Sequence, residues 1–363
     1  MGEELKSIIK VASIYIATII GAGFASGQEI MQFFSTYYEG GFYGIILAGV
    51  LFAVIGYIVL NKVYSERIRN YEEFLFPTVG WFLGWVMEIL VTLFMASVLC
   101  IMTAGAGGIV ADKISVPYQV GVLVIAIFCM LVFLTGIKGI LTLSTFVTPI
   151  LITGILGVGI YIIVNKDNPV FNTTFSFNQI THNWFFSSLL YVSYNSIIAV
   201  VVMCSLLPYL KTKKIASMGG IIGGLMLSLI AIVLNIAIYA FYPDIMSSEL
   251  PVLGIVDKYS SVLGSVYTYI LLMAMLISAI TAGYGFVDRI STKARISKRL
   301  VIIIVCGLTI PLANIGFSGL ISNVYPLFGY MGLFMMFAIL LQGLNVLPSM
   351  LPGRIVKKRV NKY

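Results

Sequence analysis

Long apolar runs alternate with short polar connections along almost the whole chain. Each run is long enough, or nearly so, for the roughly 20 residues that carry an α-helix across a bilayer. The pattern predicts an all-α polytopic membrane protein of ten spans in a single transmembrane domain. The expected spans are 7–34, 42–61, 81–110, 118–136, 141–164, 184–209, 217–241, 264–287, 300–316 and 319–346.

The composition fits this picture and leaves little room for a soluble domain. Of the 363 residues, 60% are hydrophobic and only 10% are charged, and the mean hydropathy is +1.05. Ordinary soluble domains are about one quarter charged. All four cysteines lie inside apolar runs, where they behave as small hydrophobic residues.

The positive charges are distributed unevenly between alternate connections. The N-terminal segment, the even-numbered connections and the basic tail 347–363 hold 19 of the 22 Lys and Arg residues. The opposite side holds only Lys113, Lys166 and Lys258. The positive-inside rule therefore places both termini in the cytoplasm, at the cell membrane. Topology, with contact to anionic lipids, explains the basic tail, and no nucleic-acid partner is needed.

The first span carries a glycine-rich stretch near its middle, from Gly21 to Gly27. Glycine lowers helix stability, so the span is expected to break here. Ser26 and Glu29 have the spacing of a capping box, in which the serine caps a new helix and the glutamate reaches back to it. The sequence therefore predicts a helix that starts afresh within the membrane.

The sixth span contains a comparable polar interruption from Tyr191 to Ser196, where Asn195 or Ser196 is expected to cap a second half-helix. The two interruptions occupy matching places in two five-span halves, 7–164 and 184–346. Because five is odd, the second half is inverted in the membrane. Paired broken helices in inverted repeats point to a transport site at the midplane. The alternative is that the glycines only allow helices to pack closely.

These residues carry a family resemblance. The segment from Ile19 to Phe24 resembles the first-helix signature of the amino acid–polyamine–organocation transporters. The longer string Gly21 to Ile30, GAGFASGQEI, together with length and topology, resembles the YkvI-type bacterial membrane proteins. The resemblance implies the leucine-transporter fold, with helices one and six unwound, and secondary transport of a small solute.

The resemblance also implies where a small amino acid or amine would bind. Backbone amides of the first break would hold a substrate carboxylate, and the sixth span would offer carbonyls and polar side chains to an ammonium group. The residues implied are Gly21, Ala22, Gly23, Phe24, Ser26 and Gly27 in the first span, and Tyr194, Asn195 and Ser196 in the sixth.

Four side chains are candidates for coupling transport to a proton or a sodium ion. Glu29 either caps a helix or carries the coupling proton. Glu88 has no basic residue near it in sequence, so it is expected to be protonated, to face a water-filled cavity, or to lie at the membrane interface. Ser278 and Thr281 lie on one helical face of the eighth span and are sodium candidates. No other cofactor is implied.

An enzyme is not expected, since the only histidine, His182, lies in an outside connection without metal-ligand spacing around it. A channel, or a membrane scaffold or signalling protein, remains the alternative. The outside connections 165–183 and 242–263 are long, and the second is expected to contain a short lid helix that ends near Tyr259. The sequence leaves the oligomeric state open.

Overall fold

The computed structural model describes residues 2–165, 183–245, 248, 250–315 and 317–346, and in these ranges the regular structure is helical throughout. The expected connection 165–183, apart from its ends, and the basic tail 347–363 lie outside the described residues. The longer helices are α1 (Gly2–Ile19), α4 (Glu39–Glu66), α6 (Trp81–Ile114), α7 (Tyr118–Val164), α8 (Trp184–Cys204), α9 (Lys213–Tyr239), α12 (Ser261–Ala294), α13 (Lys298–Leu312) and α14 (Phe317–Val346). The shorter ones are α2 (Ala22–Ser26), α3 (Gln28–Phe33), α5 (Tyr71–Val79), α10 (Tyr242–Ile245) and α11 (Pro251–Tyr259).

Eight segments of the described chain are long and apolar enough to cross a membrane. They correspond to expected spans two to eight and ten. Spans four and five are the two halves of α7, which bends at Gly136 with φ +72°. Span nine corresponds to α13, which has only 15 residues, and span one is divided among α1, α2 and α3. The count of ten crossings therefore stays a prediction.

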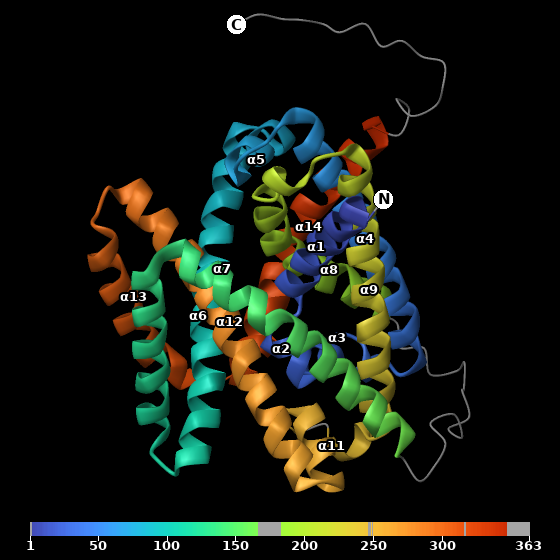
Figure 1. Ribbon diagram of the computed structural model, residues 1–363. Coiled ribbons are helices and arrows are strands. Elements are labelled where there is room, and N and C mark those ends of the chain that lie inside the picture. Colours follow the sequence, from blue (N-terminus) through green and yellow to red (C-terminus); the bar gives the residue numbers. More distant parts are fainter. Residues whose placement is uncertain (1, 166–182, 246–247, 249, 316, 347–363) are drawn as a thin grey trace, which may run out of the picture.

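The helices form two groups that follow the five-span period. Helices α1, α4, α8 and α9 pack against one another, and α6, α7, α12 and α13 form a second group beside them (Figure 1). By the expected numbering, the first group holds spans one, two, six and seven. The second group holds spans three, four, five, eight and nine, so every span in the two groups except span five has its counterpart in the same group, as an internal repeat requires. The counterpart of span five is α14, which packs on α8.

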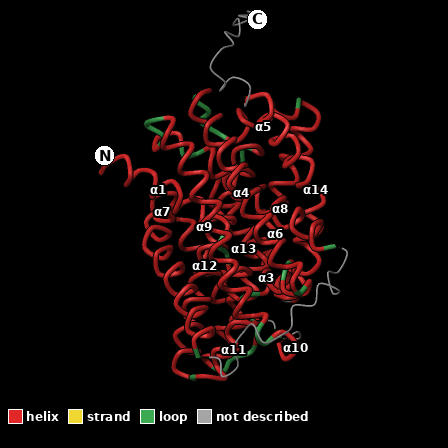
Figure 2. The backbone as a smooth tube through the Cα atoms, turned by 90° about the vertical axis from the view of Figure 1, so that its right-hand side faces the viewer, coloured by secondary structure: helices red, strands yellow, loops and turns green. Residues whose placement is uncertain are grey.

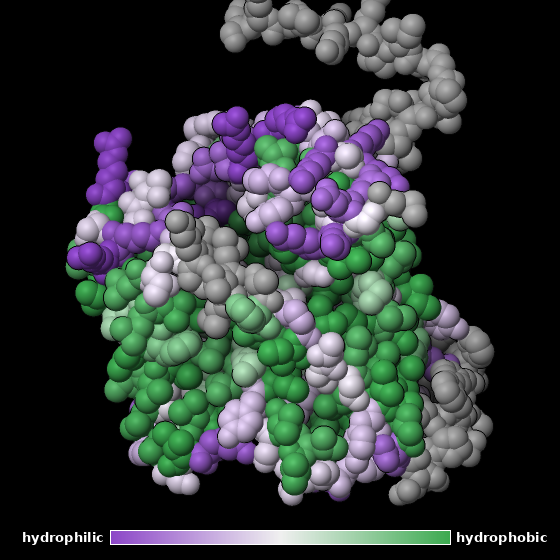
Figure 3. All heavy atoms as spheres, viewed as in Figure 1, coloured by the Kyte–Doolittle hydropathy of each residue, from purple (hydrophilic) through white to green (hydrophobic). Residues whose placement is uncertain are grey.

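The surface has an apolar belt below a polar end. Hydrophilic side chains gather at the end that carries α5 and the start of α1, and hydrophobic side chains cover most of the visible face beneath (Figure 3). Large apolar residues are widely exposed, Trp81 at 74% and Phe146 at 73% among them. Such exposure is stable in lipid rather than in water. The protein is therefore a multi-pass membrane protein.

The connection between α9 and α12 carries the expected short helix. This is α11, which begins at Pro251 and ends at Tyr259 at the end of the molecule opposite α5 (Figure 2). Proline suits the first helical turn because no amide donor is needed there. Val252, Ile255 and Val256 are buried, so α11 is packed on the helices beside it.

Glycines bring α4 and α9 into backbone contact. A Cβ atom added to Gly224 would overlap the backbone of Ala53, and one added to Gly220 would overlap the backbone of Gly56. Backbone atoms cannot move aside as the end of a flexible side chain can. The close approach of these two helices therefore depends on glycine.

We expect Gly224→Ala to lower the free energy of unfolding by about 1–3 kcal/mol, because the methyl group would force α4 and α9 apart. Gly307→Ala is the matched control, since Gly307 lies within α13 and nothing lies within 4 Å of its added Cβ. This change should stabilise the protein by up to about 1 kcal/mol. Thermal unfolding of the two purified variants in detergent measures the difference. Equal melting temperatures would contradict the glycine-dependent contact.

Candidate functional site

The first span is broken where the glycines predicted. Helix α1 ends at Ile19, and Gly21 is extended, with φ −97° and ψ −170°. The five-residue helix α2 follows, and Gly27 then turns the chain with φ +83° before α3 begins at Gln28. Positive φ favours glycine, which explains why this residue stands at the second turn.

The predicted capping box is wrong by one residue. Gly27, and not Ser26, is the N-cap of α3, so Glu29 is the second helical residue instead of the third. The Ser26 hydroxyl donates to the carbonyl of Gly23 at 3.1 Å and accepts from the amide of residue 28 at 3.3 Å. Glu29 is therefore available for contacts with other helices.

The predicted break in the sixth span is also wrong. Helix α8 is continuous from Trp184 to Cys204. The side-chain amide of Asn195 donates to the carbonyl of Tyr191 at 3.0 Å, and the Ser196 hydroxyl donates to the carbonyl of residue 192 at 2.6 Å. Both polar groups thus bond to the preceding turn of their own helix, as hydroxyls and amides in membrane helices often do, and neither caps a new helix.

A buried carboxyl joins the broken span to α8. The Tyr194 hydroxyl donates to Oε2 of Glu29 at 2.6 Å, and the Glu29 residue is only 3% exposed. A Cβ atom added to Gly23 would collide with the Glu29 carboxyl group, so the carboxyl lies directly on the glycine-rich turn. The structure therefore brings together Gly23, Glu29 and Tyr194 from spans one and six.

Four aromatic rings pack around the ring of Tyr194, and we call these five rings together the aromatic enclosure. The ring of Tyr194 lies 4.8 Å from that of Tyr325, 5.5 Å from Phe33, 5.6 Å from Tyr191 and 6.2 Å from Phe94, measured between centroids. The rings come from α3, α6, α8 and α14, and all are buried. The enclosure therefore lies where both halves of the chain meet.

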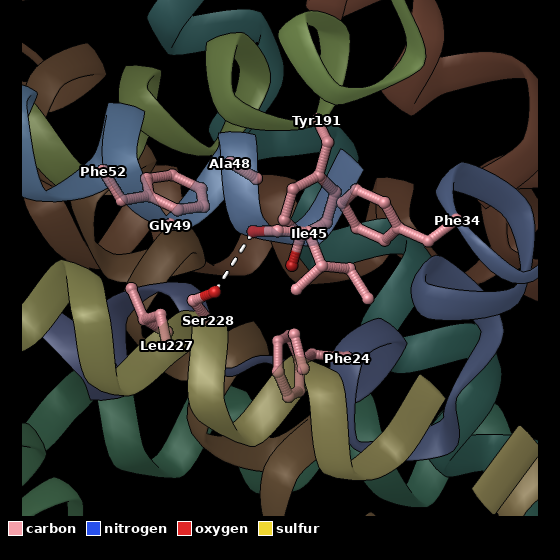
Figure 4. Close-up of a pocket in the computed structure, with 10 residues that line it drawn as sticks. Phe24, Phe34, Ile45, Ala48, Gly49, Phe52, Tyr191, Leu227 and Ser228 are labelled. Carbon is pink, nitrogen blue, oxygen red and sulfur yellow. Dashed lines mark hydrogen bonds between the residues drawn. The ribbon is translucent and has the colours of Figure 1, made fainter. Parts of the chain in front are cut away.

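A small cavity lies beside the enclosure. Its volume is about 10 Å³, which is close to the room for one water molecule. The Tyr191 ring lines it together with Phe24 and Phe34, and Figure 4 shows the Tyr191 hydroxyl pointing among these side chains. This hydroxyl is buried and has no hydrogen-bond partner among the described residues. A further polar group, the Ser228 hydroxyl, donates to the carbonyl of Ile45 at 3.1 Å.

The eighth span, α12, also contacts the break. A Cβ atom added to Gly21 would lie 3.1 Å from the Ser278 hydroxyl, so this hydroxyl faces the extended residue. The Tyr267 hydroxyl donates to the carbonyl of Ala25 at 2.6 Å. Thr281 is exposed, whereas Ser278 is half-buried. Only Ser278 of the two sodium candidates is therefore placed at the break.

Glu88 is not an isolated acid, contrary to the expectation from its sequence neighbours. Its Oε1 atom lies 2.5 Å from Nη1 of Arg289 and 2.7 Å from Nζ of Lys293. Both cations lie on α12, more than 200 positions away in sequence, and one helical turn separates them. These three side chains form an ion-pair cluster that ties α6 to α12.

Sequence reasoning missed most of the aromatic enclosure. Phe94 and Tyr325 lie in apolar runs, where they look like ordinary core residues. Tyr191 and Tyr194 gave a partial signal, because residues three apart share one face of a helix. The convergence of rings from four helices is a tertiary feature that no local pattern contains.

No known protein-family model matches this chain. The chain is similar to two curated proteins of Bacillus subtilis (strain 168), each 26% identical to it. The uncharacterized membrane protein YkvI aligns over 339 residues, which cover 92% of this chain and 95% of YkvI. The uncharacterized protein YyaD aligns over 329 residues, which cover 90% of this chain and 94% of YyaD.

Solved structures of membrane transporters share the fold. A Na+-coupled sialic acid symporter superposes with a TM-score of 0.60 at 13% identity, over 92% of this chain and 78% of that one. Mhp1, a nucleobase-cation-symport-1 family transporter, superposes with a TM-score of 0.60 at 15% identity, over 83% of this chain and 70% of Mhp1. A manganese transporter of Eremococcus coleocola superposes with a TM-score of 0.52 at 12% identity, over 94% of this chain and 88% of the transporter. The chain therefore has the leucine-transporter fold that the resemblance implied.

We expect Glu88→Gln to lower the free energy of unfolding by about 3 kcal/mol, because it leaves Arg289 and Lys293 without their shared counter-charge. Glu72→Gln is the control. Glu72 lies 3.9 Å from Lys293, but its side chain is 56% exposed, so its loss should change stability by less than about 0.5 kcal/mol. Thermal melts of both variants in detergent test this. Similar melting temperatures would show that the ion-pair cluster does not hold the two helices.

Proposed function

We propose that this protein is a secondary active transporter of a small amine-type or amino acid solute, coupled to a cation. The observation that carries the proposal is the buried hydrogen bond between Glu29 and Tyr194 at the broken first span. Ionisable groups within membrane spans are costly and mark solute or ion pathways. The shared fold with symporters supports the same function.

The break supplies what alternating access requires. Residues Gly21 and Gly27 interrupt the helix at two points six residues apart, so α2 and α3 are short segments of five and six residues. Irregular backbone is tolerated at membrane depth where it is enclosed by protein or lines a cavity. We propose that the solute binds between this segment and α8, with Gly23 and Tyr194 in contact with it.

The proposed coupling ion is a proton or a sodium ion. Glu29 is a carboxyl group within the site that can take up a proton, and Ser278 offers an oxygen ligand beside Gly21. Glu88 is already paired with two cations, so we assign it to the contact between α6 and α12. Membership in the amino acid–polyamine–organocation superfamily, a cell-membrane location and cytoplasmic termini are part of the same proposal.

The test is uptake of labelled amino acids and amines into liposomes that contain the purified protein, with sodium and proton gradients imposed separately. We expect saturable uptake that one of the gradients drives above equilibrium. Flux that does not saturate would indicate a channel. Absence of uptake with every solute and gradient would favour a scaffold or signalling protein.

Two variants test sodium as the coupling ion. We expect Ser278→Ala to raise the sodium concentration for half-maximal uptake by about tenfold, the effect of losing about 1.4 kcal/mol of ion binding. Thr281→Ala removes a hydroxyl from an exposed position on the same helix and should leave this concentration unchanged. Identical sodium dependence in both variants would remove Ser278 as an ion ligand, and uptake driven by a proton gradient alone would point to Glu29.

A further inference from the structure

Glu29 is buried without a cationic partner among the described residues. Among the described residues, the ion pairs involve other acids, and the Glu29 carboxyl accepts a hydrogen bond from a neutral hydroxyl, that of Tyr194. The neighbouring helices α3, α8 and α14 contain no Lys, Arg or His at all. A buried carboxyl that keeps its negative charge needs a positive partner, and the described residues supply none to Glu29.

The surrounding rings are suited to a cation. The faces of aromatic rings carry negative electrostatic potential, and ammonium groups bind within about 6 Å of ring centroids. Tyr194 and Tyr325 come from helices on the second half of the chain, and Phe33 and Phe94 come from the first half. One carboxyl group inside such an enclosure favours an organic cation over an anion or a neutral solute.

The position of Glu29 also disfavours a substrate carboxylate. The Glu29 carboxyl lies against Gly23, which is the turn where the substrate carboxylate of an amino acid was expected to bind. A second carboxylate at this turn would meet the negative charge of the first, and like charges in a low-dielectric site repel strongly. The protein's own carboxyl therefore takes the place of the carboxylate of the substrate.

The cavity beside Tyr191 supplies a second recognition element. The Tyr191 hydroxyl is buried without a described partner, and an unpaired buried hydroxyl costs free energy that a ligand hydroxyl would recover. Its ring is 5.6 Å from that of Tyr194. A hydroxyl group a short distance from the ammonium group would thus find a partner next to the enclosure.

We propose that the substrate is a small organic cation, an amine or methylated ammonium compound without a carboxylate, with Glu29 as its counter-ion inside the aromatic enclosure. This assignment rests on the proposed transport function and narrows its substrate class. Tyr194 positions the Glu29 carboxyl through its hydrogen bond, and Tyr191 favours compounds that carry a hydroxyl group.

The test uses pairs of compounds that share an ammonium group and differ at one end. Ethanolamine is compared with glycine, and choline with glycine betaine, by thermal shift of the purified full-length protein. Within each pair the first compound carries a hydroxyl where the second carries a carboxylate. We expect ethanolamine or choline to raise the melting temperature, and the carboxylate partner to have no effect at the same concentration.

Glu29→Gln keeps the size and hydrogen-bonding capacity of the side chain but removes the charge. We expect it to weaken binding of the amine by about tenfold or more. Glu39→Gln is the control, since it removes a buried carboxyl at the start of α4, outside the enclosure. The affinity of the Glu39→Gln variant for the amine should stay within about twofold of that of the unchanged protein, because the two sites are independent. The melting temperature of each variant without ligand shows whether it folds.

Each outcome decides the inference. Stabilisation and uptake of glycine or betaine, but not of ethanolamine or choline, would overturn the amine assignment and leave transport intact. Unchanged amine binding by Glu29→Gln, with loss of proton-gradient dependence, would make Glu29 a proton carrier instead of a counter-ion.

If the Glu29→Gln variant does not fold, the Tyr191→Phe variant tests the inference. It should weaken choline binding and leave tetramethylammonium binding unchanged, and equal effects on both compounds would count against the site. Binding of neither class would overturn the inference, and uptake of some other solute would still support a transporter.

Discussion

The structure depends on how polar groups are satisfied where the first membrane span is broken. In hydrocarbon, every backbone donor and acceptor needs a partner within the protein. The break between Ile19 and Gln28 is therefore stable only because other helices surround it. Tyr267 of α12 donates to the buried carbonyl of Ala25 within the break, and Tyr194 of α8 donates to the carboxyl of Glu29, which follows the break. These contacts hold both α8 and α12 against one short segment.

The sequence predicted features that are local and missed those that arise from packing. The glycines predicted the first break because their effect on helix stability acts within a few residues. The prediction of a capping box was wrong because Gly27 adopts positive φ, so that α3 starts one position later than expected. The prediction of a break in α8 was wrong because Asn195 and Ser196 bond to the preceding turn of their own helix. Composition alone does not distinguish such bonds from helix capping.

Glu29 and Glu88 show why burial alone does not assign a function. In the sequence both are single acids within segments that are expected to span the membrane. In the structure Glu88 meets two cations from α12, so its charge is compensated by the protein itself. Glu29 accepts a hydrogen bond from the neutral hydroxyl of Tyr194, which orients its carboxyl without supplying a positive charge. An acid that the fold neutralises serves stability, whereas an acid that the fold leaves uncompensated is suited to a ligand.

Helix α12 links these two environments. It carries Tyr267 and Ser278 at the break, and Arg289 and Lys293 at the ion-pair cluster, on one uninterrupted helix from Ser261 to Ala294. Over this length a helix spans roughly 50 Å at about 1.5 Å per residue and moves as a nearly rigid rod. A shift of the break relative to α12 therefore either breaks the Tyr267 hydrogen bond or displaces α12 as a whole. Displacement of α12 strains the ion pairs of Glu88 with Arg289 and Lys293. The ion-pair cluster therefore opposes movement of α12 unless another interaction compensates for the loss of these pairs.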